Sequence, residues 1–201
     1  MIFNYDHYQI DIKTLIKLSG QKKRRILDFG CGKGVWGQNR TNIKGIDKII
    51  LYDKEKKLTG FLKKKYKLKK IKINFNYKKI LNEERYNIVI FSSVIQYIEK
   101  NKLKKIIYDI AKNKDRKIFI LSDVPLLPRF LEFIILPVLN FKRFIFVCSI
   151  IFSRKYKNIN YNYYKKGDFN FYSKDFDVSF HSNLHDLKLL RRTIVLKLKK
   201  N

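Results

Sequence analysis

The chain has 201 residues, of which 45% are hydrophobic, so it can bury one sizeable core and has little room for a second domain. Lys and Arg number 46 against 17 Asp and Glu, giving a formal net charge of +29, but the apolar fraction is near the globular average and argues against disorder. The two cysteines, Cys31 and Cys148, have no metal-type spacing to any histidine. These features exclude a disulfide-rich secreted domain and a zinc module, and they favour a reducing cytoplasm.

The apolar stretches of the chain are short. Segments 133–141 and 144–153 are the longest uncharged apolar stretches, and each has about half of the roughly 20 residues that a membrane-spanning helix needs. The first residues lack the basic head and apolar middle of a signal peptide. We therefore expect a cytoplasmic protein, with peripheral membrane contact left open.

Basic residues are spread along nearly the whole chain instead of being concentrated in one tail or helix. Lysine outnumbers arginine, whereas readout of bases and bidentate capture of phosphates favour arginine. Nucleic acid is therefore not the favoured partner, and an anionic membrane or a lipid-linked substrate stays open as an alternative.

In chain order, short apolar runs predict strands and amphipathic spacing predicts helices. The tail holds two strand-like runs that are separated by about ten residues, too few to require a crossover helix, so they are expected to be antiparallel. The predicted strands are 25–29, 44–47, 71–75, 86–91, 117–121, 178–181 and 193–198, and the predicted helices are 51–67 and 101–111.

This alternation predicts an α/β fold of the Rossmann-like, doubly wound type. The sheet is expected to have seven strands, mostly parallel with the last strand antiparallel, and helices on both faces. No linker marks a boundary, so residues 1–201 are predicted to form a single domain. Segment 125–166 is apolar and aromatic, contains all three prolines, and is a candidate lid or insertion.

The strongest local signal is segment 26–34, ILDFGCGKG, in which an apolar strand meets three alternating glycines. Gly32, Gly34 and Gly37 also match the dinucleotide fingerprint, so NAD is a ligand to weigh. Asp28 argues against NAD, because a carboxylate just before the glycines repels a pyrophosphate and attracts an ammonium group.

Segment 26–34 closely resembles the first motif of class I S-adenosylmethionine-dependent methyltransferases. The similarity continues through Gly45-Ile46-Asp47, through segment 86–98 and into the paired terminal strands. The resemblance implies that the glycine loop holds the methionine part of the cofactor, that Asp47 binds the ribose hydroxyls, and that Asn76, in competition with Asn74, reaches the adenine. The implied cofactor-binding residues are Asp28, Gly30, Cys31, Gly32, Gly34, Asp47, Asn76, Ser92 and Ser93.

Two features depart from that family pattern. Only ten residues separate Gly34 from Gly45, where the family has a longer first helix, and Gln96-Tyr97 stand where many relatives carry Glu-His. The sequence assigns no general base and no metal site. The candidates for a base are Tyr97, His181, His185 and Asp123.

The sequence is therefore interpreted as that of an S-adenosylmethionine-dependent methyltransferase. The expected acceptor is a small molecule such as a sugar or a lipid-linked intermediate, and positioning of that acceptor in line with the activated methyl would supply most of the catalysis. The alternatives are a methyltransferase that acts on RNA or protein, and a binding protein that keeps the fold without turnover.

Overall fold

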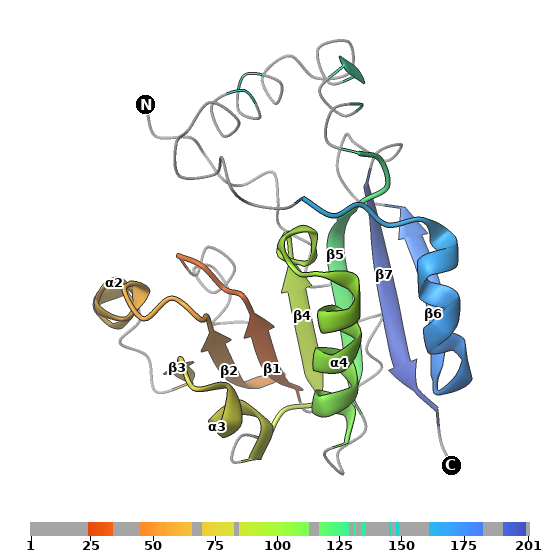
Figure 1. The fold of residues 1–201 in the computed structure, drawn as a ribbon. Coiled ribbons are helices and arrows are strands. Elements are labelled where there is room, and N and C mark those ends of the chain that lie inside the picture. Colours follow the sequence, from red (N-terminus) through yellow and green to blue (C-terminus); the bar gives the residue numbers. More distant parts are fainter. Residues whose placement is uncertain are drawn as a thin grey trace.

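The computed structural model describes most of the sheet and the helices that pack on it (Figure 1). The described residues are 24–33, 45–65, 70–82, 85–112, 117–128, 131, 134–135, 145, 148, 161–182 and 191–199.

Seven strands form one sheet in the order β3-β2-β1-β4-β5-β7-β6. The first five strands pair in parallel, and β7 runs antiparallel to both of its neighbours. This confirms the predicted fold class. The bounds are β1 Arg24–Phe29, β2 Ile46–Tyr52, β3 Ile71–Asn74, β4 Ile88–Ser92, β5 Ile118–Pro125, β6 Phe176–Ser182 and β7 Arg191–Leu198.

Helices cover both faces of the sheet. On one face, α4 (Lys100–Ala111) packs a stripe of four buried side chains against the strands, as its spacing predicts. The same face carries α3 (Tyr77–Asn82) and the 3₁₀ helix η5 (Lys166–Lys174), which lies beside β6 in Figure 1. On the other face, α2 (Leu58–Lys65) contacts β3 and buries Leu62 in the second apolar cluster.

The structure corrects two predicted elements. The strand predicted at 44–47 is instead β2, which begins at Ile46 and continues to Tyr52, and the helix predicted from residue 51 begins at Leu58. Ile49, Ile50 and Leu51 are fully buried. A continuous apolar run of this kind is typical of a parallel strand covered on both faces, but its periodicity alone does not separate it from a buried helix.

The order of the strands alone predicts where a ligand binds, before any side chain is considered. The chain moves outward from β1 through β2 to β3 on one side and through β4 to β5 on the other. Ligands of open α/β sheets bind where this order reverses, outside the carboxyl ends of the strands. Here that point lies at the carboxyl ends of β1 and β4, at the upper edge of the sheet in Figure 1.

Most of the predicted lid, 125–166, lies outside the described residues. Within the part of the chain that the structure describes, no helix is long and apolar enough to cross a membrane. Contact with a membrane surface and a cytoplasmic location stay predictions.

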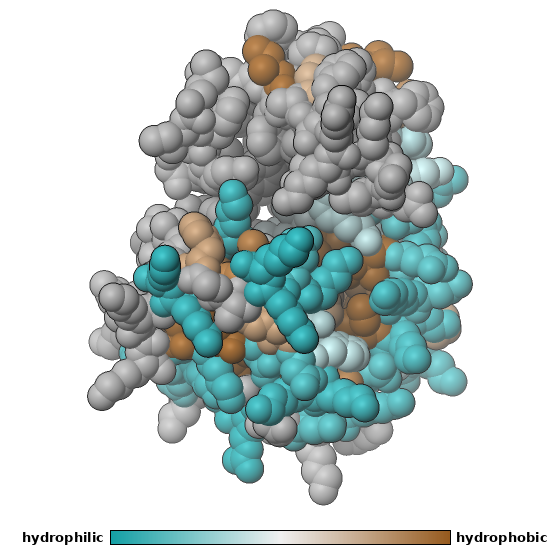
Figure 2. All heavy atoms as spheres, turned by 60° about the vertical axis from the view of Figure 1, so that its left-hand side comes forward, coloured by the Kyte–Doolittle hydropathy of each residue, from teal (hydrophilic) through white to brown (hydrophobic). Residues whose placement is uncertain are grey.

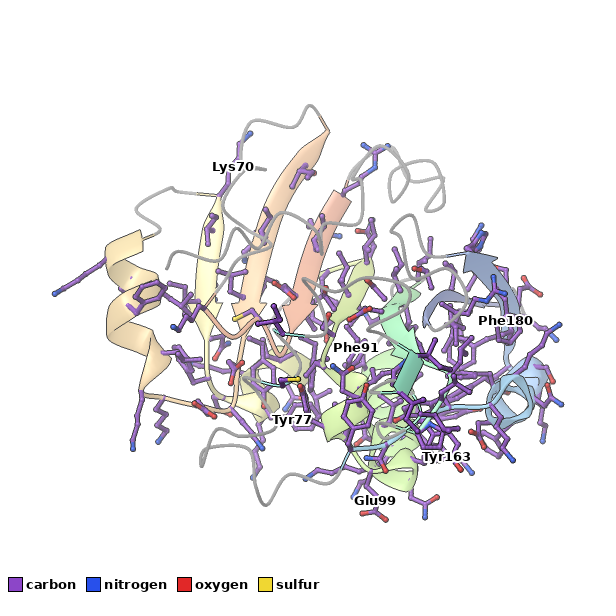
Figure 3. The ribbon with its side chains drawn as sticks, turned by 90° about the horizontal axis from the view of Figure 1, so that it is seen from above. Lys70, Tyr77, Phe91, Glu99, Tyr163 and Phe180 are labelled. Carbon is purple, nitrogen blue, oxygen red and sulfur yellow. The ribbon has the colours of Figure 1, made fainter. Side chains whose placement is uncertain are left out.

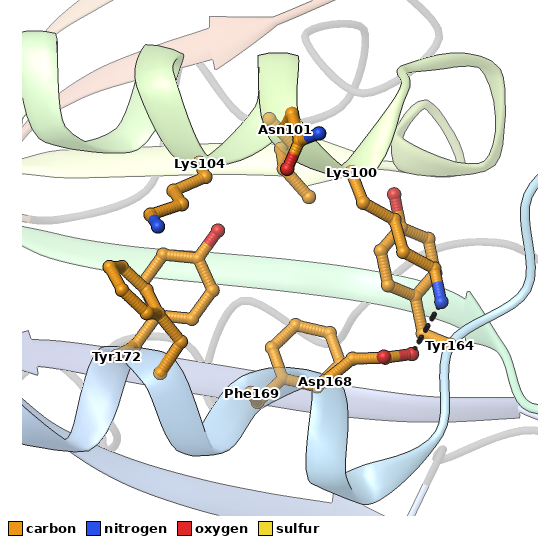
Figure 4. Close-up of a pocket in the computed structure, with 9 residues that line it drawn as sticks. Lys100, Asn101, Lys104, Tyr164, Asp168, Phe169 and Tyr172 are labelled. Atoms are coloured by element: carbon orange, nitrogen blue, oxygen red, sulfur yellow. Dashed lines mark hydrogen bonds and ion pairs between the residues drawn. The ribbon is translucent and has the colours of Figure 1, made fainter.

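A hollow of about 270 Å³ lies between α4 and η5 on the face of the sheet (Figure 4). Lys100 Nζ donates to Asp168 Oδ2 across it at 2.7 Å, and Lys104 Nζ stands 3.2 Å from the centre of the Phe171 ring. The backbone N–H of Lys165 also donates to Asp168 Oδ2, at 2.8 Å, which secures the first turn of η5. The hollow is thus explained by the packing of α4 against η5.

We expect Asp168→Asn to lower the free energy of unfolding by about 1 kcal/mol at neutral pH. Burial alone raises the pKa of Asp168, but the hydrogen bonds from Lys100 and Lys165 and their positive charges outweigh it and hold this pKa below its ordinary value. A depressed carboxyl pKa stabilises the fold fully above the unfolded pKa, and that contribution is lost as pH falls through the folded pKa.

Urea unfolding as a function of pH checks this expectation. The difference between the wild type and Asp168→Asn should be present at neutral pH and shrink below about pH 4. A difference that is unchanged by acid would show that the charge of Asp168 does not stabilise η5.

Candidate functional site

The glycine loop leaves β1 at the carboxyl edge of the sheet. Gly30 and Gly32 have φ values of +75° and +55°, which favour glycine over any residue with a Cβ. The backbone N–H groups of Gly30 and Cys31 both donate to the carbonyl of Tyr52, at 2.8 and 3.0 Å. The loop is therefore fixed to the last residue of β2. Figure 3 looks down on this edge.

Asp53 directly follows β2 and holds the glycine loop from the side. Its Oδ2 accepts from the backbone N–H of Gly32 at 2.8 Å, and its Oδ1 accepts from the N–H of Glu55 at 2.9 Å. Asp53 comes 21 residues after Gly32. An acidic residue about 20 residues after the glycines is the usual partner of a ribose in nucleotide-binding α/β folds.

The structure does not bring Asp47 to the glycine loop. Asp47 is exposed and is the second residue of β2, whose first residue pairs with Arg24 at the amino end of β1. The prediction that this strand ends on Asp47 is wrong, because β2 continues for five more residues. Sequence reasoning missed Asp53, although a carboxylate directly after the run Ile49–Tyr52 was a usable signal.

One departure from the family pattern remains. β2 begins at Ile46, so only ten residues still separate Gly34 from Gly45, where the family has a longer first helix. Gly34 itself lies outside the described residues.

Asp28 and Cys31 flank the loop with a buried carboxylate and a thiol. Asp28 is 2% exposed near the end of β1. Burial, followed by the negative charges of Asp28 and Asp53, raises the pKa of the Cys31 thiol well above its ordinary range. Cys31 therefore stays protonated at neutral pH, which disfavours a nucleophilic role.

A second turn packs against the glycine loop from the end of β4. Ser92 is the last residue of β4, and Ser93 and Val94 follow it. A Cβ placed on Gly30 would lie 2.4 Å from Val94 Cγ2. The β4 turn and the glycine loop are thus in direct contact through Val94. Binding of the cofactor by Ser92 and Ser93 stays a prediction.

Ser93 directly follows β4, and it forms a hydrogen-bonded pair with Asp123 of β5, the residue directly after the last one that pairs with β4. Ser92 of β4 pairs in register with Ser122 of β5. Ser93 Oγ donates to Asp123 Oδ2 at 2.7 Å. Their φ values are +52° and +60°, and no other residue except glycine in the described part of the chain has a positive φ.

Gln96 supports this turn from the short helix η3 (Ile95–Tyr97). Its Nε2 donates to the carbonyl of Ser93 at 2.8 Å, whereas its Oε1 is buried and has no hydrogen-bond partner. Gln96 is 4% exposed, and Tyr97 beside it is 40% exposed with its ring against Tyr161. The structure thus separates an inward glutamine from an outward tyrosine.

At the end of β3, Asn76 and Asn74 have different environments. Asn76 caps α3, because its Oδ1 accepts from the N–H of Lys79 at 3.4 Å. Asn74 is 7% exposed, and its Nδ2 is buried without a hydrogen-bond partner. The side-chain Nδ2 of Asn74 can therefore donate to a ligand, whereas the side chain of Asn76 caps α3.

Both asparagines line a hollow of about 530 Å³ between α2 and α3. Lys56, Lys63 and Lys79 stand around it, and its remaining lining comes from the apolar and aromatic residues next to the asparagines. Figure 2 brings this side of the molecule forward and shows hydrophilic side chains around a few hydrophobic ones.

His181, the histidine candidate that lies in the described part of the chain, is not near the glycine loop. His181 lies on β6, which β5 and β7 separate from β4, and its Nε2 is 3.0 Å from Ser179 Oγ. His185 lies outside the described residues. Among the residues that the structure describes, no three His, Cys, Asp or Glu side chains form a group that could hold a metal ion.

Comparison with known proteins gives a family and several similar folds. Residues 2–107 match the profile of the family described as methyltransferase small domain. No curated protein sequence matches the chain significantly.

Three solved structures illustrate the similarity of the fold. The magnesium protoporphyrin IX methyltransferase ChlM from Synechocystis, with bound S-adenosylhomocysteine, gives a TM-score of 0.62 at 13% identity over 94% of this chain and 80% of that one. The methyltransferase domain of bacterial CtHen1-C gives 0.64 at 14% identity, covering 98% of this chain and 100% of that one. The N-methyltransferase NodS from Bradyrhizobium japonicum gives 0.55 at 9% identity, covering 94% and 85%.

Proposed function

Because the chain belongs to the methyltransferase small domain family, whose cofactor is S-adenosylmethionine, we propose that it transfers the methyl group of this cofactor to a small-molecule acceptor. S-Adenosylmethionine supplies a methyl group that its sulfonium centre has already activated. The protein then has to bind the cofactor, orient the acceptor in line with the methyl group, and take up any proton that is released.

The residues at the carboxyl ends of β1 and β2 fit this cofactor. A Cβ placed on Gly32 would meet no atom within 4 Å, so the loop borders open space. Buried Asp28 provides negative charge for an ammonium group, and Asp53 provides a carboxylate for a ribose diol. Asn74 Nδ2 is a buried donor without a partner at the end of β3, where an adenine ring nitrogen could accept from it.

The preference for a small acceptor rests on the charge of this edge. Asp53 directly follows β2, and Asp28 and Asp123 lie one and two residues before the carboxyl ends of β1 and β5, in a chain with only 17 acidic residues against 46 basic ones. Carboxylates attract the cationic groups of the cofactor and repel the phosphates of a nucleic acid. ChlM and NodS, which have similar folds, are named for small-molecule and N-methyl transfer, respectively.

RNA is the second candidate acceptor, and one observation favours it. Lys56, Lys63 and Lys79 surround the hollow at the end of β3, where a phosphate backbone could lie. The small RNA methyltransferase HEN1 also has a similar fold, with a TM-score of 0.63 at 14% identity.

Transfer of a labelled methyl group distinguishes the two acceptors. Purified protein is incubated with methyl-labelled S-adenosylmethionine and, separately, with the small-molecule fraction and the RNA fraction of a cell extract. The proposal predicts label in the small-molecule fraction and a loss of that label in Asp53→Ala. Label in RNA alone would replace the small-molecule proposal with the RNA one, and label in neither fraction would contradict both.

A further inference from the structure

We propose that Ser93 and Asp123 form the acceptor-side site of this enzyme, with Asp123 taking the proton from an O–H or N–H group as that group is methylated. The inference rests on the proposed function, because it assigns the acceptor chemistry of the same site. It names the substrate class as a hydroxyl or amine that still carries a proton.

The backbone of the pair gives the first argument. Non-glycine residues adopt left-handed backbone only where the surrounding structure holds them there, and such residues cluster at functional sites. Ser93 and Asp123 are the two examples in the described part of the chain, and their side chains bond to each other at 2.7 Å. Two residues with strained backbone whose side chains bond to each other indicate that this arrangement serves a function.

The position of the pair gives the second argument. Ser93 directly precedes Val94, whose side chain fills the space beside Gly30. The pair therefore stands next to the glycine loop, on the β4 and β5 side of it, whereas Asp53 stands on the β2 side. The loop thus has one carboxylate toward β2, suited to the ribose, and another toward β5.

The polarity around Ser93 gives the third argument. Asp123 is 8% exposed, so its carboxylate lies in a largely buried setting beside Ser93. Gln96 Oε1 belongs to the amide that donates to the Ser93 carbonyl, and it is a buried acceptor without a partner. A buried acceptor without a partner is costly, and a hydrogen-bond donor on a ligand would satisfy it. Gln96 Oε1 thus favours a ligand that donates a hydrogen bond beside Ser93.

The step is balanced in atoms and charge. The lone pair of the acceptor oxygen or nitrogen forms a bond to the methyl carbon, the bond from that carbon to sulfur breaks, and its electron pair stays on sulfur. The proton of the acceptor moves to the Asp123 carboxylate. Ser93 is a positioning residue, because its hydroxyl holds Asp123 Oδ2 at 2.7 Å.

Two cofactor analogues test Asp123 without knowledge of the acceptor. S-Adenosylhomocysteine lacks the transferred methyl group, and sinefungin carries a protonated amine in its place. Asn tolerates left-handed backbone as Asp does, so Asp123→Asn keeps the shape and removes the charge. Asp177→Asn, on the exposed part of β6, is the matched control.

Calorimetry should show that the wild type binds sinefungin about tenfold more tightly than S-adenosylhomocysteine. Asp123→Asn should lose this preference, with the S-adenosylhomocysteine Kd changed by less than about twofold, and Asp177→Asn should behave as the wild type. The inference is wrong if the wild type shows no preference, if the preference survives in Asp123→Asn, or if that variant weakens both ligands equally. Failure of the wild type to bind S-adenosylhomocysteine would instead remove the proposed function and this inference with it.

Ser93→Gly tests the positioning residue, because glycine adopts φ near +52° without strain and lacks the hydroxyl. With methyl-labelled cofactor and the small-molecule fraction, kcat should fall by about tenfold or more while the KM for the cofactor is unchanged. A rise in the cofactor KM with unchanged kcat would overturn the positioning role.

Discussion

Asp53→Ala is expected to weaken the binding of S-adenosylhomocysteine by about 100-fold, whereas Asp47→Asn leaves binding unchanged. The carboxylate of Asp53 follows β2 and is hydrogen-bonded to the glycine loop, where its Oδ2 accepts from the N–H of Gly32. Two charge-assisted hydrogen bonds to the ribose diol would be lost together, along with the tether on the loop. Calorimetric titration of the three proteins measures the effect.

One further variant and one control measurement complete this comparison. Asp53→Asn keeps the shape and one acceptor oxygen, so it should fall between the wild type and Asp53→Ala. Thermal unfolding of each variant shows whether the loop has lost its structure. Weakened binding in Asp47→Asn, with normal binding in Asp53→Ala, would show that Asp47 binds the ribose hydroxyls, as the sequence analysis predicted.

Gly30→Ala is expected to lower the free energy of unfolding by about 2 to 4 kcal/mol. The substitution imposes a Cβ at φ +75° and drives that carbon to 2.4 Å from Val94 Cγ2, so backbone strain and overlap act together. Urea unfolding measures the effect, provided that the slope of the transition is unchanged.

Gly32→Ala is the matched control for Gly30→Ala. Gly32 also has a positive φ, +55°, but its added Cβ meets no atom within 4 Å, so only the backbone cost of about 1 to 2 kcal/mol remains. Val94→Ala combined with Gly30→Ala should recover part of the additional loss. Equal losses for both glycine variants would show that the loop moves away from Val94 at little cost.

The fold was largely predictable because its signals are local and repeated. Buried parallel strands are continuous apolar runs, α4 has a regular apolar stripe, and segment 26–34 joins a strand to glycines with positive φ. The family resemblance inferred from that segment is confirmed by the match over residues 2–107. The short helix α3 was missed because its six residues contain one buried side chain, Ile80.

The site was less predictable because its residues lie at the ends of strands, and sequence patterns locate strand ends less reliably than they locate the strands themselves. The predicted second strand ends at Asp47, whereas β2 ends at Tyr52, so the carboxylate at its carboxyl end is Asp53 and Asp47 lies near the other end. The contact between Ser93 and Asp123 joins residues 30 apart in the chain, and no local pattern encodes it. Asn76 and Asn74 have the same side chain, and only burial and the capping of α3 separate their roles.

The most direct test of the account is a calorimetric titration of the wild-type protein with S-adenosylhomocysteine and, separately, with NAD. We expect one molecule of S-adenosylhomocysteine to bind per chain at micromolar affinity, and no measurable binding of NAD. Binding of NAD, or of neither ligand, would contradict the assignment of the glycine loop and Asp53 to S-adenosylmethionine.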